Sequence, residues 1–256
     1  MNIENQLIYG GSILGSKLNI NKSLDILNFL YSKGVKEYDI SDFYGLGNCL
    51  NIFSIFENES KKDLKLNLKL GLQPIFNNFL IDIILKKIDK NFFSLFFKNK
   101  IFEQRYNYNL EYLETKVRSF DENLRFNKIN SLILHNASKK LISEDHILLL
   151  KKLKKSGIIN KFGISISDDE ITYFDNNFLE IFDIIQLKFS ENNLKKNYDN
   201  SEIQYYSIIS SFKNLKNEQN NFDLYFNNII NKINKTNKKL IFTSRRKSHI
   251  RNLLNR

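Results

Sequence analysis

Residues 35–45 read VKEYDISDFYG, an apolar run that ends in polar residues which a buried strand would not need. Tyr38 and Ile40 suit a pleated, half-buried strand, and the Ser-Asp-Phe-Tyr-Gly that follows is typical of a loop. Asp39 and Tyr44 would then lie near one another across the turn. We therefore predict that this strand ends in a functional site.

The same pattern returns twice further along the chain. Residues 64–71 read LKLNLKLG, an alternation of apolar and polar residues that predicts a strand, with Lys69 near its end. The apolar run 129–134 is followed directly by His135. Three consecutive candidate strands thus end on titratable side chains, with helical sequence between them. Because the chemistry of a (β/α)₈ barrel collects at the carboxyl ends of its parallel strands, this recurrence predicts an α/β fold, the TIM barrel.

The remaining periodicity supplies the other elements of such a barrel. Strands are expected at residues 6–11, 35–40, 61–70, 129–134, 162–165, 182–187, 203–209 and 239–242, and helices at 21–33, 45–56, 109–126, from 143, at 222–233 and from 244. Residues 72–106, which hold the only proline, predict an irregular excursion above the barrel. A barrel typically needs ~250 residues. The chain therefore fits one domain, residues 1–256.

Composition excludes several classes of protein. A hydrophobic fraction of 42% and 22 phenylalanines argue against disorder. The net charge of +11 would suit nucleic-acid binding. However, lysine greatly outnumbers arginine and is scattered over helical faces, so we expect no nucleic-acid or membrane partner. The single cysteine, Cys49, excludes an intrachain disulfide and a cysteine-based zinc cluster, and we expect no metal. The first residues do not resemble a signal peptide, which favours the cytoplasm.

Four of these positions resemble the signature of the aldo-keto reductase family. That signature has an Asp at a strand end, a Tyr five residues later before Gly, a Lys followed by an apolar residue and Gly, and a His at another strand end. The matching residues are Asp39, Tyr44, Lys69 and His135. Residues 154–165, KKSGIINKFGIS, are similar to the family's helix, glycine turn and fifth strand. The resemblance spans nearly the whole chain and implies the same barrel.

The resemblance implies reduction of an aldehyde or ketone with a nicotinamide cofactor. Tyr44 would deliver the proton, because a neighbouring Lys69 ammonium lowers the pKa of its phenol. Asp39 would hold Lys69 in place, and His135 would polarise the carbonyl oxygen as a neutral donor. Taken singly, each residue has a structural alternative: Asp39 and Lys69 as a buried ion pair, and Tyr44 as a rim aromatic. His135 would then be a satisfied core histidine.

The nicotinamide site implied by the resemblance is matched in part. Ser165 and Gln186 match the residues with which the family holds the carboxamide, but Ile166 replaces the expected Asn. Tyr206 is placed to stack on the nicotinamide, or equally to pack within the barrel. We therefore expect a nicotinamide site that lacks one hydrogen-bonding side chain.

The phosphate end departs further from the family. Phe242 and Thr243 stand where the family has Pro-Gly. Ser244, Arg245, Arg246 and Lys247 still place a hydroxyl and three cations at a helix start, where exposed amides and the helix dipole bind anions. Because a guanidinium suits a 2′-phosphate, NADP(H) is preferred and NAD(H) remains possible. The alternative is a solvated run of charges.

Three hypotheses for the whole chain follow. The first is an NADP(H)-dependent reductase acting on a small-molecule carbonyl substrate. The second is a catalytically weakened barrel that serves as a cofactor-binding or regulatory module. NADPH titration separates them, because only an enzyme would also oxidise the cofactor with a carbonyl compound. Nucleic-acid binding, the third, would show a steep salt dependence of affinity. The substrate and the oligomeric state are left open.

Overall fold

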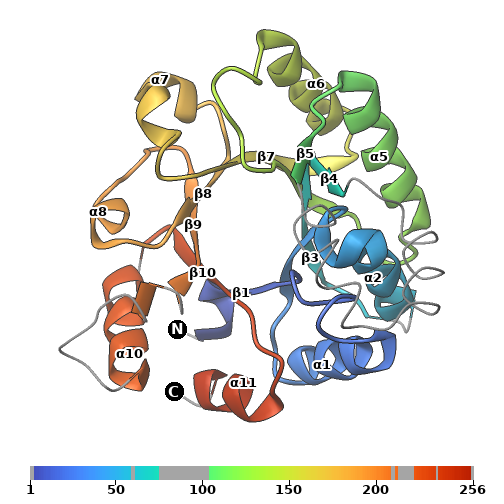
Figure 1. Ribbon diagram of the computed structural model, residues 1–256, viewed down its shortest axis with the longest axis vertical. Helices are drawn as coiled ribbons and strands as arrows, with labels where there is room; N and C mark the ends of the chain where they lie inside the picture. Colours follow the sequence, from blue (N-terminus) through green and yellow to red (C-terminus); the bar gives the residue numbers. More distant parts are fainter. Residues whose placement is uncertain are drawn as a thin grey trace, which may run out of the picture.

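The computed structural model describes residues 3–58, 61–74, 104–208, 211–212, 222–234 and 236–254. Eight parallel strands form its centre: β1 (Leu7–Gly10), β2 (Glu37–Ser41), β3 (Lys65–Leu70), β6 (Ile129–Leu134), β7 (Ile159–Ile166), β8 (Ile184–Lys188), β9 (Glu202–Tyr206) and β10 (Lys238–Phe242). They close in the order β1-β10-β9-β8-β7-β6-β3-β2. In Figure 1 the strands form a ring, and the helices lie outside it. The predicted (β/α)₈ barrel is confirmed.

Most predicted strand ends differ from the observed ones by a few residues, and in two strands the difference has the same physical reason. The third strand begins at Lys65 and not at residue 61, because Asp63 has a φ of 63°. The seventh ends at Tyr206 and not at residue 209, since Ser207 also has a φ of 63°. A residue in the left-handed region cannot continue an extended strand. Each of the two therefore marks a strand boundary.

Several of the helices begin at a side chain that caps them. They are α1 (Ile20–Ser32), α2 (Asn48–Asn58), α5 (Leu110–Asn123), α6 (Glu144–Lys155), α7 (Asn176–Leu179), α8 (Glu191–Leu194), α10 (Phe222–Ile233) and α11 (Lys247–Leu254), with 3₁₀ turns η1 (Ile3–Gln6), η2 (Tyr44–Gly47) and η3 (Ile171–Tyr173). The Asn19 side chain accepts from the Lys22 N–H at 3.0 Å before α1. Before α6, His146 Nδ1 accepts from the N–H of the predicted cap, Ser143, at 3.1 Å.

Side chains of β2 alternate between the surrounding helices and the barrel interior. Tyr38 packs against Phe53 and Phe56 of α2, with ring centroids 5.1 and 5.8 Å away. Glu37 and Asp39 point the opposite way, into the barrel, where both are buried. Burying an unpaired carboxylate is costly, so each must find a cation or donors inside. The interior of this barrel therefore holds a polar column as well as apolar side chains.

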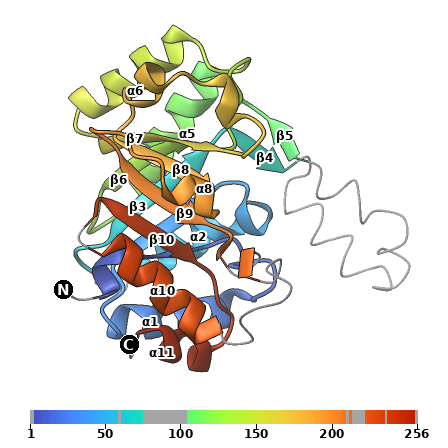
Figure 2. The same cartoon turned by 90° about the vertical axis from the view of Figure 1, so that its left-hand side faces the viewer.

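A short hairpin stands at the end of the barrel where β3 stops (Figure 2). Its strands are β4 (Leu72–Pro74) and β5 (Gln104–Tyr106), paired antiparallel. The predicted excursion at residues 72–106 begins and ends in this hairpin, and residues 75–103 lie outside the described part of the chain. Within the described part, no helix has the length and apolar character needed to cross a membrane.

Candidate active site

Asp39 and Lys69 form a buried ion pair between neighbouring strands. They lie on β2 and β3, and Lys69 Nζ is 2.8 Å from Asp39 Oδ1. Burial is the largest single influence and favours the neutral amine, yet the charge of Asp39 and the phenol of Tyr44 together outweigh it and raise the pKa of Lys69 above its ordinary value. Lys69 is therefore a fixed cation, and Asp39 keeps it charged.

Tyr44 follows β2 at the start of η2. Gly45 makes this turn possible, because its φ is 60° and a Cβ there would collide with the Leu14 carbonyl oxygen. The Tyr44 ring centroid lies 5.1 Å from Lys69 Nζ. Burial raises the pKa of Tyr44 to about 12, and the Lys69 charge opposes this rise. The lysine thus acts in the predicted direction but is outweighed, so the phenol stays protonated at neutral pH.

His135 follows β6 and lies beside Tyr44. The backbone N–H of His135 donates to the Leu70 carbonyl at 2.7 Å, and the backbone carbonyl of His135 accepts from Tyr108 Oη at 2.6 Å. The imidazole lies 5.6 Å from the Tyr44 ring at an interplanar angle of 83°. Burial, and then the Lys69 charge, holds the pKa of His135 well below its ordinary value. The imidazole is therefore neutral and has one N–H to donate.

One cavity of about 470 Å³ is lined by all four side chains, Asp39, Tyr44, Lys69 and His135. Sequence analysis missed a residue that supports it, Tyr108. The Tyr108 ring lies against Gly71, whose φ of 113° and lack of a side chain make room for it. No periodicity in the sequence marks Tyr108, because its role comes from contacts with distant strands. Within the described residues, no group of three His, Cys, Asp or Glu side chains is placed to hold a metal ion.

Comparison with known proteins accounts for this arrangement. The profile described as "Aldo/keto reductase family" matches residues 6–203. The chain belongs to the aldo/keto reductase family. Membership implies an oxidoreductase that acts on small carbonyl compounds with a nicotinamide cofactor.

Solved structures of other aldo/keto reductases share the fold. An aldo-keto reductase from Bacillus halodurans in its holo form has a TM-score of 0.68 and 13% sequence identity, and the match covers 98% of this chain and 85% of that one. Glycerol dehydrogenase from Gluconobacter oxydans has a TM-score of 0.66 and 14% identity, covering 97% and 85%. A search of curated proteins gave no match. At these identities the likeness shows the barrel alone.

The predicted nicotinamide residues of this aldo/keto reductase have different surroundings. Ser165 and Tyr206 line the cavity with the four side chains above. Gln186 is fully buried, and its Nε2 donates to Asp39 Oδ2 at 2.6 Å and to Gln204 Oε1 at 2.9 Å. Its Oε1 has no hydrogen-bond partner among the described residues. The structure therefore brings Ser165 and Tyr206 into the cavity wall and places Gln186 directly behind Asp39.

The nicotinamide end of a cofactor fits these residues. Ser165 offers a hydroxyl in the cavity wall, and Gln186 has a buried acceptor beside Asp39 that lacks a donor. A carboxamide NH₂ is the kind of donor that such an acceptor lacks. Ile166 is buried and apolar, so it adds no hydrogen bond. Ser165 is thus the side chain that would hold the carboxamide from the cavity wall, whereas Gln186 is fully buried behind Asp39 and does not line the cavity.

The predicted phosphate end is built on the turn before α11. Ser244 is buried, and its Oγ accepts from the Arg246 N–H at 3.2 Å. This turn explains why α11 begins at Lys247 and not at residue 244 as predicted. Arg245 and Arg246 are exposed, whereas Lys247 Nζ lies 2.6 Å from Asp25 Oδ1. Neither arginine has an ion-pair partner in the described ranges, so both side chains are available to an anion.

Proposed function

We propose that this chain reduces an aldehyde or ketone to the alcohol with NADPH, and that Tyr44 donates the proton. One observation carries the proposal: in a member of this family, a single cavity is lined by the four side chains that such a reaction uses, Asp39, Lys69, Tyr44 and His135. The other lining residues include both apolar and polar side chains, as expected for a small-molecule site.

Proton delivery is the task of Tyr44. A bound nicotinamide supplies the hydride that adds to the carbonyl carbon, so negative charge develops on the carbonyl oxygen. The Tyr44 hydroxyl gives its proton to that oxygen, which leaves a neutral alcohol and a phenolate. Lys69, 5.1 Å from the ring centroid, stabilises the phenolate. Asp39 is itself an anion, so its contribution is to fix and charge Lys69.

The carbonyl oxygen is held by His135. A neutral imidazole can donate one hydrogen bond to that oxygen and stabilise the charge that develops there. The low pKa of His135 supports this role, because burial and the Lys69 charge both oppose a second proton on the ring. Tyr44 is then the acid of the pair, and His135 orients the substrate.

Arg245 and Arg246 support the preference for NADP(H). Both are exposed at the start of α11 and lack ion-pair partners in the described ranges. A guanidinium binds a phosphate dianion through paired N–H donors, and only NADP(H) carries the 2′-phosphate. Ser244 is the third predicted residue here. Its Oγ accepts from the Arg246 N–H, which stabilises the turn that presents the two arginines.

A second candidate function is a module that binds the cofactor with weak turnover. Two residues favour it. Gln186 Nε2 is already engaged by Asp39, and Ile166 offers no polar group to the carboxamide. A nicotinamide held by fewer hydrogen bonds is oriented less firmly, and misorientation lowers the rate of hydride transfer more than it lowers affinity.

The test is NADPH titration followed by NADPH oxidation with a panel of aldehydes and ketones. We expect saturable binding and turnover of at least one carbonyl compound, with turnover lost in Tyr44→Phe. Binding without oxidation across the panel would favour the second candidate. Failure to bind NADPH or NADH would refute both.

A further inference from the structure

Ser41 lies behind the catalytic histidine, between two groups that compete for its proton. It is fully buried at the end of β2. Its Oγ lies 3.2 Å from His135 Nδ1 and 3.4 Å from Asp42 Oδ1, and it accepts from the Phe43 N–H at 3.1 Å. A hydroxyl has one proton, so Ser41 can donate to only one of these two neighbours at a time.

The direction of that one hydrogen bond determines which nitrogen of His135 carries the proton. When Ser41 donates to Nδ1, Nδ1 is an acceptor and Nε2 must carry the hydrogen. When Ser41 donates to Asp42, Nδ1–H donates to Ser41 instead, and Nε2 becomes an acceptor. Nε2 makes no hydrogen bond within the described part of the chain, while the imidazole lines the cavity. Only the first arrangement presents an N–H to a carbonyl oxygen.

We propose that Ser41 is a positioning residue that sets the tautomer of His135, and that the charge on Asp42 decides which way the Ser41 hydroxyl donates. This inference rests on the proposed function, in which His135 donates to the substrate. An ionised Asp42 draws the Ser41 proton and leaves the nitrogen that faces the substrate without a hydrogen. A neutral Asp42 releases the hydroxyl to His135 Nδ1.

The surroundings of Asp42 allow both charge states near neutral pH. From α5, Tyr112 Oη donates to Asp42 Oδ2, and the Lys116 charge also acts on the carboxylate. From α2, the Cys49 thiol lies within electrostatic range. Burial outweighs these hydrogen bonds and the lysine, and raises the pKa of Asp42 to about 6. Because the pKa of His135 lies well below its ordinary value, the ring stays neutral while Asp42 titrates, so only its tautomer changes.

A pH dependence with a definite sign follows. Below about pH 6 Asp42 is protonated, and Ser41 donates to His135. As pH rises through that value, the Nε2–H tautomer loses population. A hydrogen bond to an ionised carboxylate is stronger than one between neutral groups, and the difference corresponds to roughly a tenfold change in the tautomer ratio. The rate of carbonyl reduction should fall in proportion to the fraction of molecules in the Nε2–H tautomer, since Tyr44 remains protonated throughout.

Nitrogen-15 NMR of the imidazole rings tests this directly and needs no turnover. The chain has three histidines, which keeps the spectrum simple. His146 is an internal reference, because its Nδ1 accepts from the Ser143 N–H and its Nε2 lies 2.7 Å from the Tyr108 carbonyl, which fixes its tautomer. The His135 signal is assigned from its loss in His135→Gln. We expect the His135 tautomer ratio to change over a pH range that spans the Asp42 titration.

Three variants complete the experiment. Ser41→Ala removes the shared hydroxyl and Asp42→Asn removes the titrating charge, so both should make the His135 tautomer ratio independent of pH. Ser131→Ala is the matched control, since it deletes a buried strand hydroxyl that donates to Asn67 and not to the site. It should keep the pH step. A constant ratio in the wild type, or a step that persists in Ser41→Ala, overturns the inference. A step in the NMR titration without carbonyl turnover would refute only the proposed function.

Discussion

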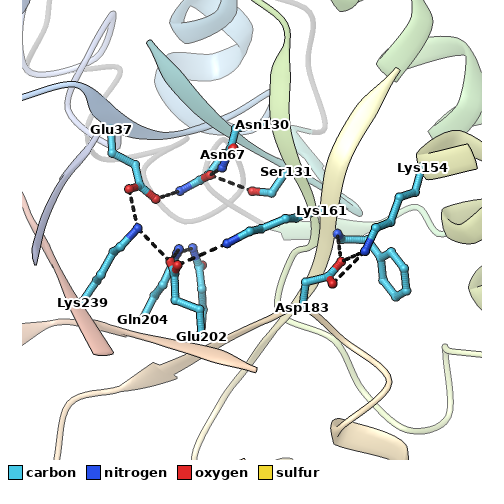
Figure 3. Close-up of polar contacts among 12 residues, drawn as sticks. Glu37, Asn67, Asn130, Ser131, Lys154, Lys161, Asp183, Glu202, Gln204 and Lys239 are labelled. Carbon is cyan, nitrogen blue, oxygen red and sulfur yellow. Dashed lines mark hydrogen bonds and ion pairs between the residues drawn. The ribbon is translucent and has the colours of Figure 1, made fainter. Parts of the chain in front are cut away.

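Both ends of the barrel bury a lysine against carboxylates, yet the candidate active site occupies only one of them. At the amino-terminal end, Lys239 Nζ lies 2.7 Å from Glu37 Oε2 and 3.2 Å from Glu202 Oε1 (Figure 3). At the carboxyl end, Lys69 Nζ lies 2.8 Å from Asp39 Oδ1. The charges and distances are alike. The difference lies in what surrounds each pair.

The amino-terminal cluster satisfies its own polar groups. Glu37 Oε1 accepts from Asn67 Nδ2 at 2.9 Å, and Glu202 Oε1 accepts from Gln204 Nε2 at 2.7 Å. Lys161 Nζ lies 3.4 Å from the other oxygen of Glu202. Every carboxylate oxygen of this cluster therefore has a partner, and its two lysines balance its two glutamates. No carboxylate oxygen of this cluster is left without a partner that a ligand could supply.

At the carboxyl end, by contrast, not every buried polar atom has a hydrogen-bond partner. A cavity borders Asp39, Tyr44 and His135, and Gln186 Oε1 has no partner in the described part of the chain. A buried ion pair alone is thus weak evidence of function. An ion pair beside open volume and unsatisfied groups is stronger evidence, because those groups can be completed by a ligand. Gln204 connects the two ends, since it bonds both Glu202 and Gln186.

Replacing Lys69 or Lys239 by methionine should have the largest effect and tests whether only the carboxyl end has a catalytic function. Lys69→Met and Lys239→Met each leave buried carboxylate without its cation, which costs about 3–5 kcal/mol of folding free energy. Only Lys69→Met should also lose turnover, by at least the ~10²–10⁴-fold typical of general acid catalysis, because Tyr44 loses the cation that stabilises its phenolate. Urea unfolding and turnover per folded molecule are the measurements. Equal loss of turnover in both variants would mean that the two ends do not differ in function.

Removing the hydroxyl of Tyr44 or of Tyr38 distinguishes an effect on the reaction from an effect on stability. Tyr44→Phe should lower the rate of reduction by ~10²–10⁴-fold with NADPH affinity and fold retained. Tyr38→Phe is the control, because Tyr38 Oη donates only to the Val35 carbonyl, at 2.8 Å, on the helix side of β2. It should cost about 0.5–1.5 kcal/mol of stability and leave turnover unchanged. In Lys69→Met, adding Tyr44→Phe should cost little more, since both act on one proton transfer. Near-normal turnover of Tyr44→Phe would assign the acid to another group.

The predicted catalytic residues could be located from sequence because a barrel gathers strand ends. Asp39, Lys69 and His135 each lie at or next to the end of an apolar or alternating run, so knowing that the strands are parallel was enough to expect them together. The strand boundaries at Asp63 and Ser207 could not be predicted in this way. Both residues have a positive φ; aspartate is one of the types that adopt it, but many aspartates do not, and serine gives no such signal.

Side-chain direction across the barrel was also beyond the sequence. Gln186 matches a cofactor position by its place in the chain, yet its Nε2 donates to Asp39 and Gln204, which come from two other strands. The pKa of Tyr44 is a similar case. The sequence indicated the nearby cation Lys69, but the larger effect is burial, which depends on the packing of the whole site.

Replacing Arg245 and Arg246, which precede α11, tests whether these side chains bind the 2′-phosphate of NADPH. Arg245→Ala with Arg246→Ala should weaken NADPH binding by about tenfold or more, because hydrogen bonds to a charged group contribute about 1.5–3 kcal/mol. NADH binding should change little, since NADH lacks the 2′-phosphate. Arg251→Ala, exposed on the same helix, controls for loss of positive charge. Titrations of each variant with both cofactors give the result, and equal losses for NADPH and NADH would show that the arginines do not read the 2′-phosphate.

The smallest expected effect comes from the amino-terminal cluster. Burial alone would raise the pKa of Glu202, but Lys239, Gln204 and Lys161 together outweigh burial, and the pKa lies below its ordinary value of 4.5. A depressed carboxyl pKa stabilises the fold above the ordinary value, and this contribution is lost as pH falls through the folded pKa. Glu202→Gln should therefore lower stability at neutral pH. It should also flatten the loss of stability below about pH 4.5 in acid unfolding curves.

Turnover of Glu202→Gln shows whether the two ends of the barrel are independent. Glu202 is joined to Asp39 only through Gln204 and Gln186, and the glutamine oxygen can still accept from Gln204 Nε2. Because the hydrogen-bonded chain survives while the charge is lost, we expect the rate per folded molecule to stay within about twofold, as for distant sites without shared partners. A larger loss at full folding would show that the charge of the amino-terminal cluster reaches Asp39 through the two glutamines. The cluster would then belong to the catalytic apparatus and not only to the fold.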